Sequence, residues 1–188
     1  MRKIIITIII LGALAGGAYY FRDNLLKPAV TQSANTGSGA TAEAIAEIKS
    51  YQYTETHAQP AYNFSFKYPK EFMVSEVPDA NGGDAILVQN TATNIGVQIL
   101  VTPFEGQDIN VTEAVIRGDI PDMQMSEAQE ILIGDTRKGL AFVSDNESFG
   151  GKSREVWFVY GGNLYQISTY YELDGFLKGL FGTWEFTQ

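Results

Sequence analysis

The sequence contains no cysteine and only one histidine in 188 residues. The absence of cysteine excludes a disulfide framework, thiolate zinc sites, a catalytic thiol and a lipid-modified cysteine. Any Ser-His-Asp triad would have to use the single histidine, His57. Because His57 lies in a polar stretch ahead of the expected domain, we expect a solvated side chain rather than a rigidly held catalytic base.

Basic residues are also scarce, with 13 Lys and Arg against 22 Asp and Glu and a net charge of −9. The first 27 residues contain four of the bases and one of the acids, which leaves nine bases and 21 acids, a net charge of −12, in the remainder. A domain of this charge repels phosphate backbones and anionic lipid headgroups, which argues against a nucleic-acid partner. It favours cationic partners.

Motifs for cofactors are missing. Gly150-Gly151-Lys152-Ser153 resembles the end of a phosphate-binding loop, but Asn146 stands where the loop requires its first glycine. A strand rather than a helix is expected to follow, so we interpret the segment as the entry to a hairpin. We expect no cofactor.

Acidic residues cluster around one predicted helix, and Asp108, Glu113, Asp119 and Asp122 are the candidate cation ligands. A calcium site would need several of these oxygens to converge on one point. The spacing does not match an EF-hand loop, so we expect a solvated acidic face and no metal.

Residues 1–21 form the longest apolar segment. Ile4 to Phe21 contains no charged residue, and 18 residues approach the length that crosses a bilayer. This length favours an uncleaved transmembrane anchor, with a signal peptide cleaved at Ala13-Leu14-Ala15 as the alternative. Arg2 and Lys3 indicate a cytoplasmic N-terminus and a C-terminal domain outside the membrane.

Residues 22–60 are predicted to be a flexible linker, because Thr31 to Thr41 is small and polar. Residues 41–50 are alanine-rich and could form a short helix. An extracytoplasmic domain is expected over residues 61–188.

The domain is predicted to be α+β. Phe64 and Phe66 alternate with polar residues as in a half-buried strand, and further strands are expected at Phe72–Val77, Ala85–Gln89, Ile95–Thr102, Glu130–Gly134 and Leu140–Ser144. Asn110 and Glu113 have the spacing of a capping box, which predicts a helix with an apolar stripe of Val111, Ala114, Val115 and Gly118. Leu173, Phe176, Leu177, Leu180 and Phe181 predict a second helix.

Residues 154–171 are predicted to form a β-hairpin. The turn is either Gly161-Gly162 or Gly162-Asn163, and both choices place Phe158 and Ile167 on the same, core-facing side. Trp157 and Val159 lie on the opposite side, where a helix is expected to cover them.

Aromatic residues outside the expected core are the only positive indication of a binding surface, since Tyr and Trp are enriched at interfaces. The candidate binding residues are Trp157, Tyr170 and Tyr171, and Tyr51 and Tyr53 are also expected to be exposed. For Trp157 we favour an ordinary core position under a helix over a binding role.

Several short aromatic segments together resemble the PsbP-like domain family over residues 61–188. They are the FSFKYP strand (residues 64–69), the EVWFVY and LYQIST strands of the hairpin and the terminal WEF. The resemblance implies an antiparallel sheet with helices on both faces and an accessory or binding role. Photosynthetic members are soluble lumenal subunits that assist the water-oxidising complex, and the predicted anchor separates this chain from them. We therefore expect a membrane-anchored accessory or binding module that is not an enzyme, with a cell-envelope hydrolase using unplaced carboxylates as the alternative.

Overall fold

The computed structural model describes residues 48, 50–78, 82–93, 95–105, 110–134, 136–146 and 151–187. The predicted anchor, most of the predicted linker and Asp108 lie outside these residues. No helix within the described ranges is long and apolar enough to cross a membrane.

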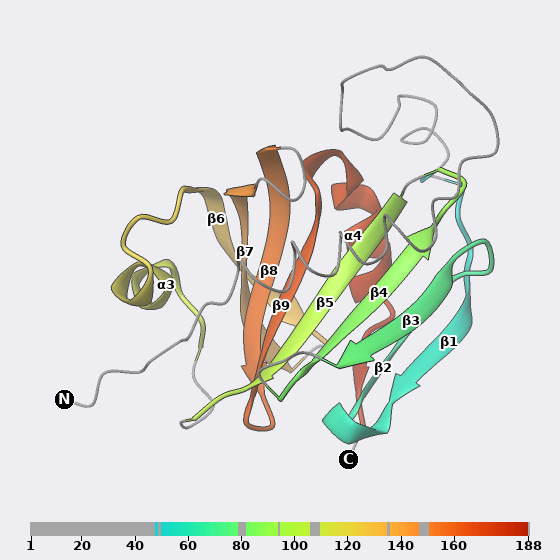
Figure 1. Cartoon of the computed structure of the whole chain (residues 1–188), viewed down its shortest axis with the longest axis horizontal. Helices are drawn as coiled ribbons and strands as arrows, with labels where there is room; N and C mark the ends of the chain where they lie inside the picture. Colours follow the sequence, from blue (N-terminus) through green and yellow to red (C-terminus); the bar gives the residue numbers. More distant parts are fainter. Residues whose placement is uncertain are drawn as a thin grey trace.

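The described residues are mostly β-sheet with few helices (Figure 1). The larger sheet has seven antiparallel strands in the order β3-β4-β5-β9-β8-β7-β6. Their bounds are β3 Met73–Pro78, β4 Asp84–Asn90, β5 Ile95–Pro103, β6 Met125–Ile133, β7 Arg137–Asn146, β8 Gly151–Tyr160 and β9 Asn163–Tyr170. A smaller antiparallel sheet has the order β1-β2-β10, with β1 Tyr53–Gln59, β2 Phe64–Pro69 and β10 Glu185–Phe186.

The β8–β9 hairpin lies inside the larger sheet, and the predicted strand faces are confirmed. Tyr160 pairs with Asn163 and Phe158 pairs with Tyr165, so the two-residue turn is Gly161-Gly162. Both glycines have positive φ, 58° and 75°, as a type I′ hairpin turn requires. Phe158 and Ile167 are fully buried on the same face, as predicted.

The main hydrophobic core lies between one face of the larger sheet, the smaller sheet and helix α4 (Asp174–Phe181). The predicted stripe of α4 is confirmed, because Phe176, Leu177 and Leu180 are buried in this core. The short helix η1 (Pro60–Tyr62) connects β1 to β2, and the short helix η3 (Tyr171–Leu173) connects β9 to α4. The smaller sheet was not predicted, because its first strand, β1, has a polar sequence that was assigned to the linker.

A second, smaller core lies on the opposite face of the larger sheet, where helix α3 (Glu113–Asp119) covers β7 and β8. Trp157 and Val159 are each 2% exposed there, so the predicted helix cover is confirmed.

The predicted capping box of α3 is wrong. The N-cap is Thr112, whose hydroxyl accepts a hydrogen bond from the Val115 amide, and not Asn110. The two buried apolar residues at this end are Val111 and Ile116. They flank the cap at the positions of a hydrophobic staple, and the predicted stripe contained Val111 but not Ile116.

The boundary between linker and domain also differs from the prediction. Tyr53–Gln59 form strand β1, which pairs along β2, although this stretch was assigned to the linker. Ile48 and Tyr51 are buried in the main core. The described domain therefore starts at least 13 residues before Ala61.

His57 is held in the fold rather than solvated, which corrects the sequence prediction. It lies opposite Phe66 in the small sheet, and the two rings are 5.2 Å apart. Its Nε2 lies 3.4 Å from Glu76 Oε1 on β3. Burial lowers the pKa of His57 below its ordinary value, and the Glu76 carboxylate opposes this shift.

Candidate functional site

A groove of about 400 Å³ lies between the outer strands of the larger sheet and α4. Strands β6, β7 and β8 form one wall, and α4 with the segment that follows it forms the other. The lining is Gln129, Ile131, Leu132, Gly134, Ala141, Arg154, Val156, Asp174, Leu177, Lys178, Phe181, Gly182 and Trp184. This volume lies in the range of sites that hold a small organic molecule.

The charged rim of the groove is organised around Arg154 of β8. Its Nη2 lies 3.2 Å from Glu127 Oε2, and its Nε lies 3.1 Å from Asp174 Oδ1. The guanidinium also lies 5.5 Å from the centre of the Tyr171 ring. Asp174 is shared with Lys178, whose Nζ lies 2.6 Å from Oδ2. Two cations and two carboxylates therefore form one network on which the strands and α4 converge.

A β-bulge in β6 brings Glu127 to this network. The register between β6 and β7 shifts between Ser126 and Gln129. Glu127 has a φ of 52°, a left-handed conformation that is uncommon outside glycine. Bulges near sheet edges commonly redirect one side chain, and this one directs the Glu127 carboxylate to Arg154 and to the Tyr171 hydroxyl.

Trp184 lines the groove and joins it to the main core. Its ring stacks on Phe64 with centroids 4.5 Å apart and contacts Phe158 edge to face. The side chain is 3% exposed, and its Nε1–H has no hydrogen-bond acceptor among the described residues. A buried donor without an acceptor costs roughly 1–3 kcal/mol.

A second polar cluster is buried on the opposite face of the same strands. Glu155 is 2% exposed, and Ser153 donates to its Oε1 at 2.5 Å. Ser144 also donates to Oε1, while Ser168 and Trp157 Nε1 donate to Oε2. The carboxylate thus receives donors from β7, β8 and β9 and ties the three strands together. This cluster is a structural element of the sheet and not an open site.

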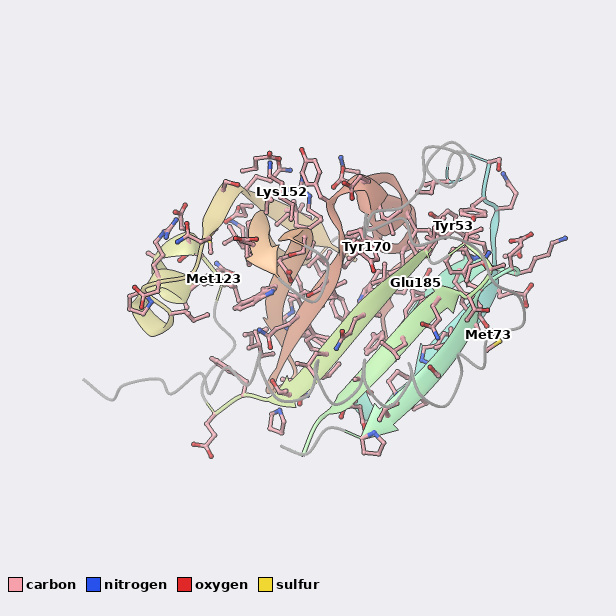
Figure 2. All side chains as sticks on the ribbon, turned by 45° about the horizontal axis from the view of Figure 1, so that its top comes forward. Tyr53, Met73, Met123, Lys152, Tyr170 and Glu185 are labelled. Atoms are coloured by element: carbon pink, nitrogen blue, oxygen red, sulfur yellow. The ribbon has the colours of Figure 1, made fainter. Side chains whose placement is uncertain are left out.

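The predicted binding residues fall in different places. Trp157 is buried in the second core, so the core alternative is confirmed for it. Tyr170 is half-buried against the main core. Tyr171 is half-buried beside the groove rim, where Lys152 and Arg154 each lie 5.5 Å from its ring centre (Figure 2 labels Lys152 and Tyr170). Of the remaining aromatics expected to be exposed, Tyr51 is in the main core and Tyr53 packs against it.

The acidic candidates do not form a metal centre in the described part of the chain. Glu113 forms an ion pair with Arg117, 2.7 Å away, one turn along α3. Asp119 is the last residue of α3, and Asp122 is exposed after it. Asp108 lies outside the described residues. Within the described ranges, no three His, Asp or Glu side chains are grouped closely enough to hold a metal ion.

Sequence reasoning missed the residues that line the groove, although one signal was present. The parity that places Val156 and Phe158 on the core face places Arg154 on it as well. A charged residue at the end of a core-facing row indicates either an edge of the core or a site. The same parity places Glu155 beside Trp157 on the face under α3.

Comparisons with known proteins give a structural similarity and no family. No protein-family model matches the sequence, and no curated protein matches it. The structure is similar to the solution structure of cyanobacterial PsbP (CyanoP) from Synechocystis sp. PCC 6803, with a TM-score of 0.49 and 8% sequence identity over 84% of this chain and 98% of that chain. That protein is a PsbP, the family that the sequence resembles, and nothing further is inferred from the similarity.

Proposed function

We propose that this chain is a membrane-tethered, extracytoplasmic binding module and that the groove between β6–β8 and α4 is its binding surface. The observation that carries the proposal is the composition of the groove. Its lining contains apolar side chains from both sides together with the ion-paired side chains of the rim, in a volume of about 400 Å³. Ligand-binding pockets contain both kinds of group.

The geometry supports binding rather than hydrolysis. A glycoside hydrolase needs two carboxylates that flank a common cleft. The groove lining contains one carboxylate, that of Asp174. This carboxylate lies between Arg154 and Lys178 and forms ion pairs with both. The second carboxylate of the rim, on Glu127, also contacts Arg154. We therefore favour a binding function for this chain over hydrolysis.

The tether is the second part of the proposal. Residues 4–21 would hold the protein in the membrane, with the N-terminus in the cytoplasm and the domain outside. Intact-mass measurement on protein extracted from membranes tests this part. The full-length mass is expected, and a mature N-terminus at Gly16 would contradict the anchor.

A groove-filling variant tests the binding surface. Gly182 lines the groove with φ −63°, and a Cβ there would make only ordinary contacts with backbone oxygens, at 3.4 and 3.5 Å. Gly182→Leu should therefore fold and occupy the groove. Gly118→Leu is the matched control, because Gly118 lies in α3 and a Cβ there meets no atom within 4 Å.

Native mass spectrometry of the full chain, purified from membranes, provides the measurement. A bound species is expected on the wild type and on Gly118→Leu and not on Gly182→Leu. A species that remains on Gly182→Leu, or its absence from all three proteins, would contradict the groove as the binding surface.

A further inference from the structure

Strand β6 is the last strand of the larger sheet (Figure 1), and its outer side borders the groove. Within the described ranges, β6 pairs with β7 alone. In an antiparallel pair, successive residues direct their backbone N–H and C=O groups alternately toward the partner strand and away from it. The groups of β6 that point away from β7 form a row of donors and acceptors at strand spacing, which is a template for a further strand.

The groove reaches this backbone edge and not only one face of the strand. Ile131 and Leu132 both line the groove, although side chains of consecutive strand residues lie on opposite faces of a sheet. Ile131 packs against the main core, and Leu132 is 65% exposed on the other face. Two neighbours on opposite faces line one groove where that groove runs along the edge of their strand.

The exposure of β6 agrees with an open edge. Every residue from Ser126 to Glu130 is exposed, whereas buried and half-buried residues alternate along β5 inside the same sheet. The bulge interrupts regular pairing between Ser126 and Gln129, so the regular part of the edge runs from Gln129 to Ile133. At about 3.4 Å per residue, this length accommodates one short extended segment.

The other edge strand of the larger sheet, β3, is less suited to pairing. It has six residues and ends in Pro78, which has no backbone N–H to donate. Its Glu76 also accepts a hydrogen bond from Gln59 of the smaller sheet at 2.7 Å. The open edge with the greater length is therefore that of β6.

The chemistry of this edge selects an extended peptide, because extended backbone presents donors and acceptors at the matching spacing. A second copy of the chain is disfavoured as the source. Each copy has a net charge of −9, and β6 contains two glutamates and no basic residue, so two such edges repel each other. The predicted linker is also poorly suited, since residues 31–41 include Gly, Ala and Asn, which are depleted in strands.

We propose that β6 accepts a strand from a partner protein. An extended segment of about five residues pairs with the free edge between Gln129 and Ile133 and lies in the groove beside α4. Main-chain hydrogen bonds supply the affinity, and alternate side chains of the segment contact the groove. This inference rests on the proposed function and names the kind of partner.

The test uses the full chain in nanodiscs of zwitterionic lipid and a fluorescein-labelled peptide. The peptide alternates valine and threonine with a lysine at each end, and its valines are N-methylated. One of its backbone edges therefore remains free to pair, and the other is blocked. The control peptide has the same sequence with every residue N-methylated, so it has the same charge and no free edge.

Fluorescence anisotropy should show saturable binding, with a Kd at least about tenfold lower for the half-methylated peptide than for the control. Hydrogen exchange should locate the peptide, because an added strand slows the exchange of outward amides between Gln129 and Ile133 and leaves β3 unchanged. Gly182→Leu should abolish binding, and Gly118→Leu should leave it intact.

Proline substitutions separate the edge from the fold. Gln129 and Glu130 are exposed neighbours, and their backbone N–H groups point to opposite sides of β6. Of Gln129→Pro and Glu130→Pro, one removes an outward donor and the other removes a bond to β7. The variant that keeps the urea midpoint of the wild type is the edge variant, and it should bind the half-methylated peptide at least about tenfold more weakly.

Equal affinity for the two peptides would overturn the proposal, as would slowed exchange outside β6 alone. Slow exchange at β6 without peptide would also overturn it. If this slow exchange is lost when residues 22–47 are replaced by a Gly-Ser sequence of equal length, the occupant is the linker, and if it appears only with a concentration-dependent dimer, the occupant is a second copy. Absence of peptide binding, with a native-mass species still excluded by Gly182→Leu, would refute strand addition and leave the binding function standing.

Discussion

The rings of Phe158 and Tyr165 face each other across the β8–β9 hairpin, with centroids 4.5 Å apart and planes within 7° of parallel. Both side chains are fully buried. The Tyr165 hydroxyl also donates to the Tyr62 carbonyl, which joins the larger sheet to the turn between β1 and β2. This pair connects the hairpin with the small sheet through one core.

Phe158→Ala should destabilise the domain by roughly 3–5 kcal/mol, because it removes a buried aromatic ring and leaves a cavity. Urea unfolding measures the loss as a lower midpoint. Leu132→Ala is the matched control, since Leu132 is 65% exposed at the edge of the same sheet, and its midpoint should stay close to that of the wild type. An unchanged midpoint for Phe158→Ala would contradict the packing.

The sequence could predict which side chains of the hairpin face the core. Side chains alternate between the two faces of a strand, and both possible turns give the same assignment. The sequence could not predict in this way that β1 is part of the domain. Its sequence, YTETHAQ, is polar, and it is held by pairing with β2 and by contacts with α4 more than 100 residues away. On the edge strand β3, residue type does not predict burial either. Met73 is apolar but 61% exposed at the margin of the larger sheet (Figure 2).

The groove could be predicted only in part. Strand parity also places Arg154 on the core face, a signal that the sequence analysis did not use, and nothing in the sequence indicated the groove between β6–β8 and α4. The left-handed position of the bulge that directs Glu127 to Arg154 is not a glycine, so the sequence does not indicate the bulge. The sequence therefore predicted a sheet with both faces covered, and the groove could be found only in the structure.

Thr112→Ala should destabilise α3 by roughly 1 kcal/mol, the usual effect of losing an N-cap side chain. Asn110→Ala should have little effect, because the Val115 amide donates to Thr112 and not to Asn110. Urea midpoints of the two variants make the comparison. A larger loss for Asn110→Ala would restore the capping box predicted from the sequence.

Glu155→Ala should destabilise the domain by roughly 2–4 kcal/mol, since the buried serine hydroxyls and the Trp157 indole N–H lose a charged acceptor. Glu113→Ala is the control, because its carboxylate is exposed and pairs only with Arg117 on the same helix. Chemical unfolding with tryptophan emission as the signal measures both. Equal effects of the two substitutions would contradict a structural role for the Glu155 cluster.

Stability should fall as the pH decreases below about 6.5. Burial lowers the pKa of His57 in the folded state from its ordinary 6.5. The unfolded chain therefore binds more protons than the folded chain between the folded pKa and 6.5, and the free energy of unfolding decreases as the pH falls through that window. Below the folded pKa this loss is complete.

Two variants isolate the histidine from the carboxylates that also titrate in acid. His57→Gln should remove this component of the pH dependence. Glu76→Gln should enlarge it, because the carboxylate that raises the pKa of His57 is lost. Urea midpoints between about pH 7.5 and 5.5 provide the measurement. Identical pH profiles for the wild type and His57→Gln would refute the assignment.

Gly179→Ala should destabilise the domain even though alanine favours helices. A Cβ at Gly179 would collide with the Tyr53 ring, which lies on α4 and donates a hydrogen bond to the Phe176 carbonyl at 3.0 Å. The ring also stacks on Phe176. The substitution must therefore displace Tyr53, and β1 with it, from the helix. Gly118→Ala makes the same change in α3, where the added Cβ meets nothing, and should stabilise by roughly 0.5–1 kcal/mol.

The titration of Tyr53 distinguishes this mechanism from a general loss of stability. Burial, and secondarily Tyr51, raise the pKa of Tyr53 to about 12. Once displaced by Gly179→Ala, Tyr53 should ionise near its ordinary 10. Ultraviolet titration of the folded protein should then show one fewer late-ionising tyrosine than in Gly118→Ala. If Gly179→Ala is as stable as Gly118→Ala and its tyrosines titrate identically, then β1 does not rest on α4, and the stretch from Tyr53 belongs to the linker after all.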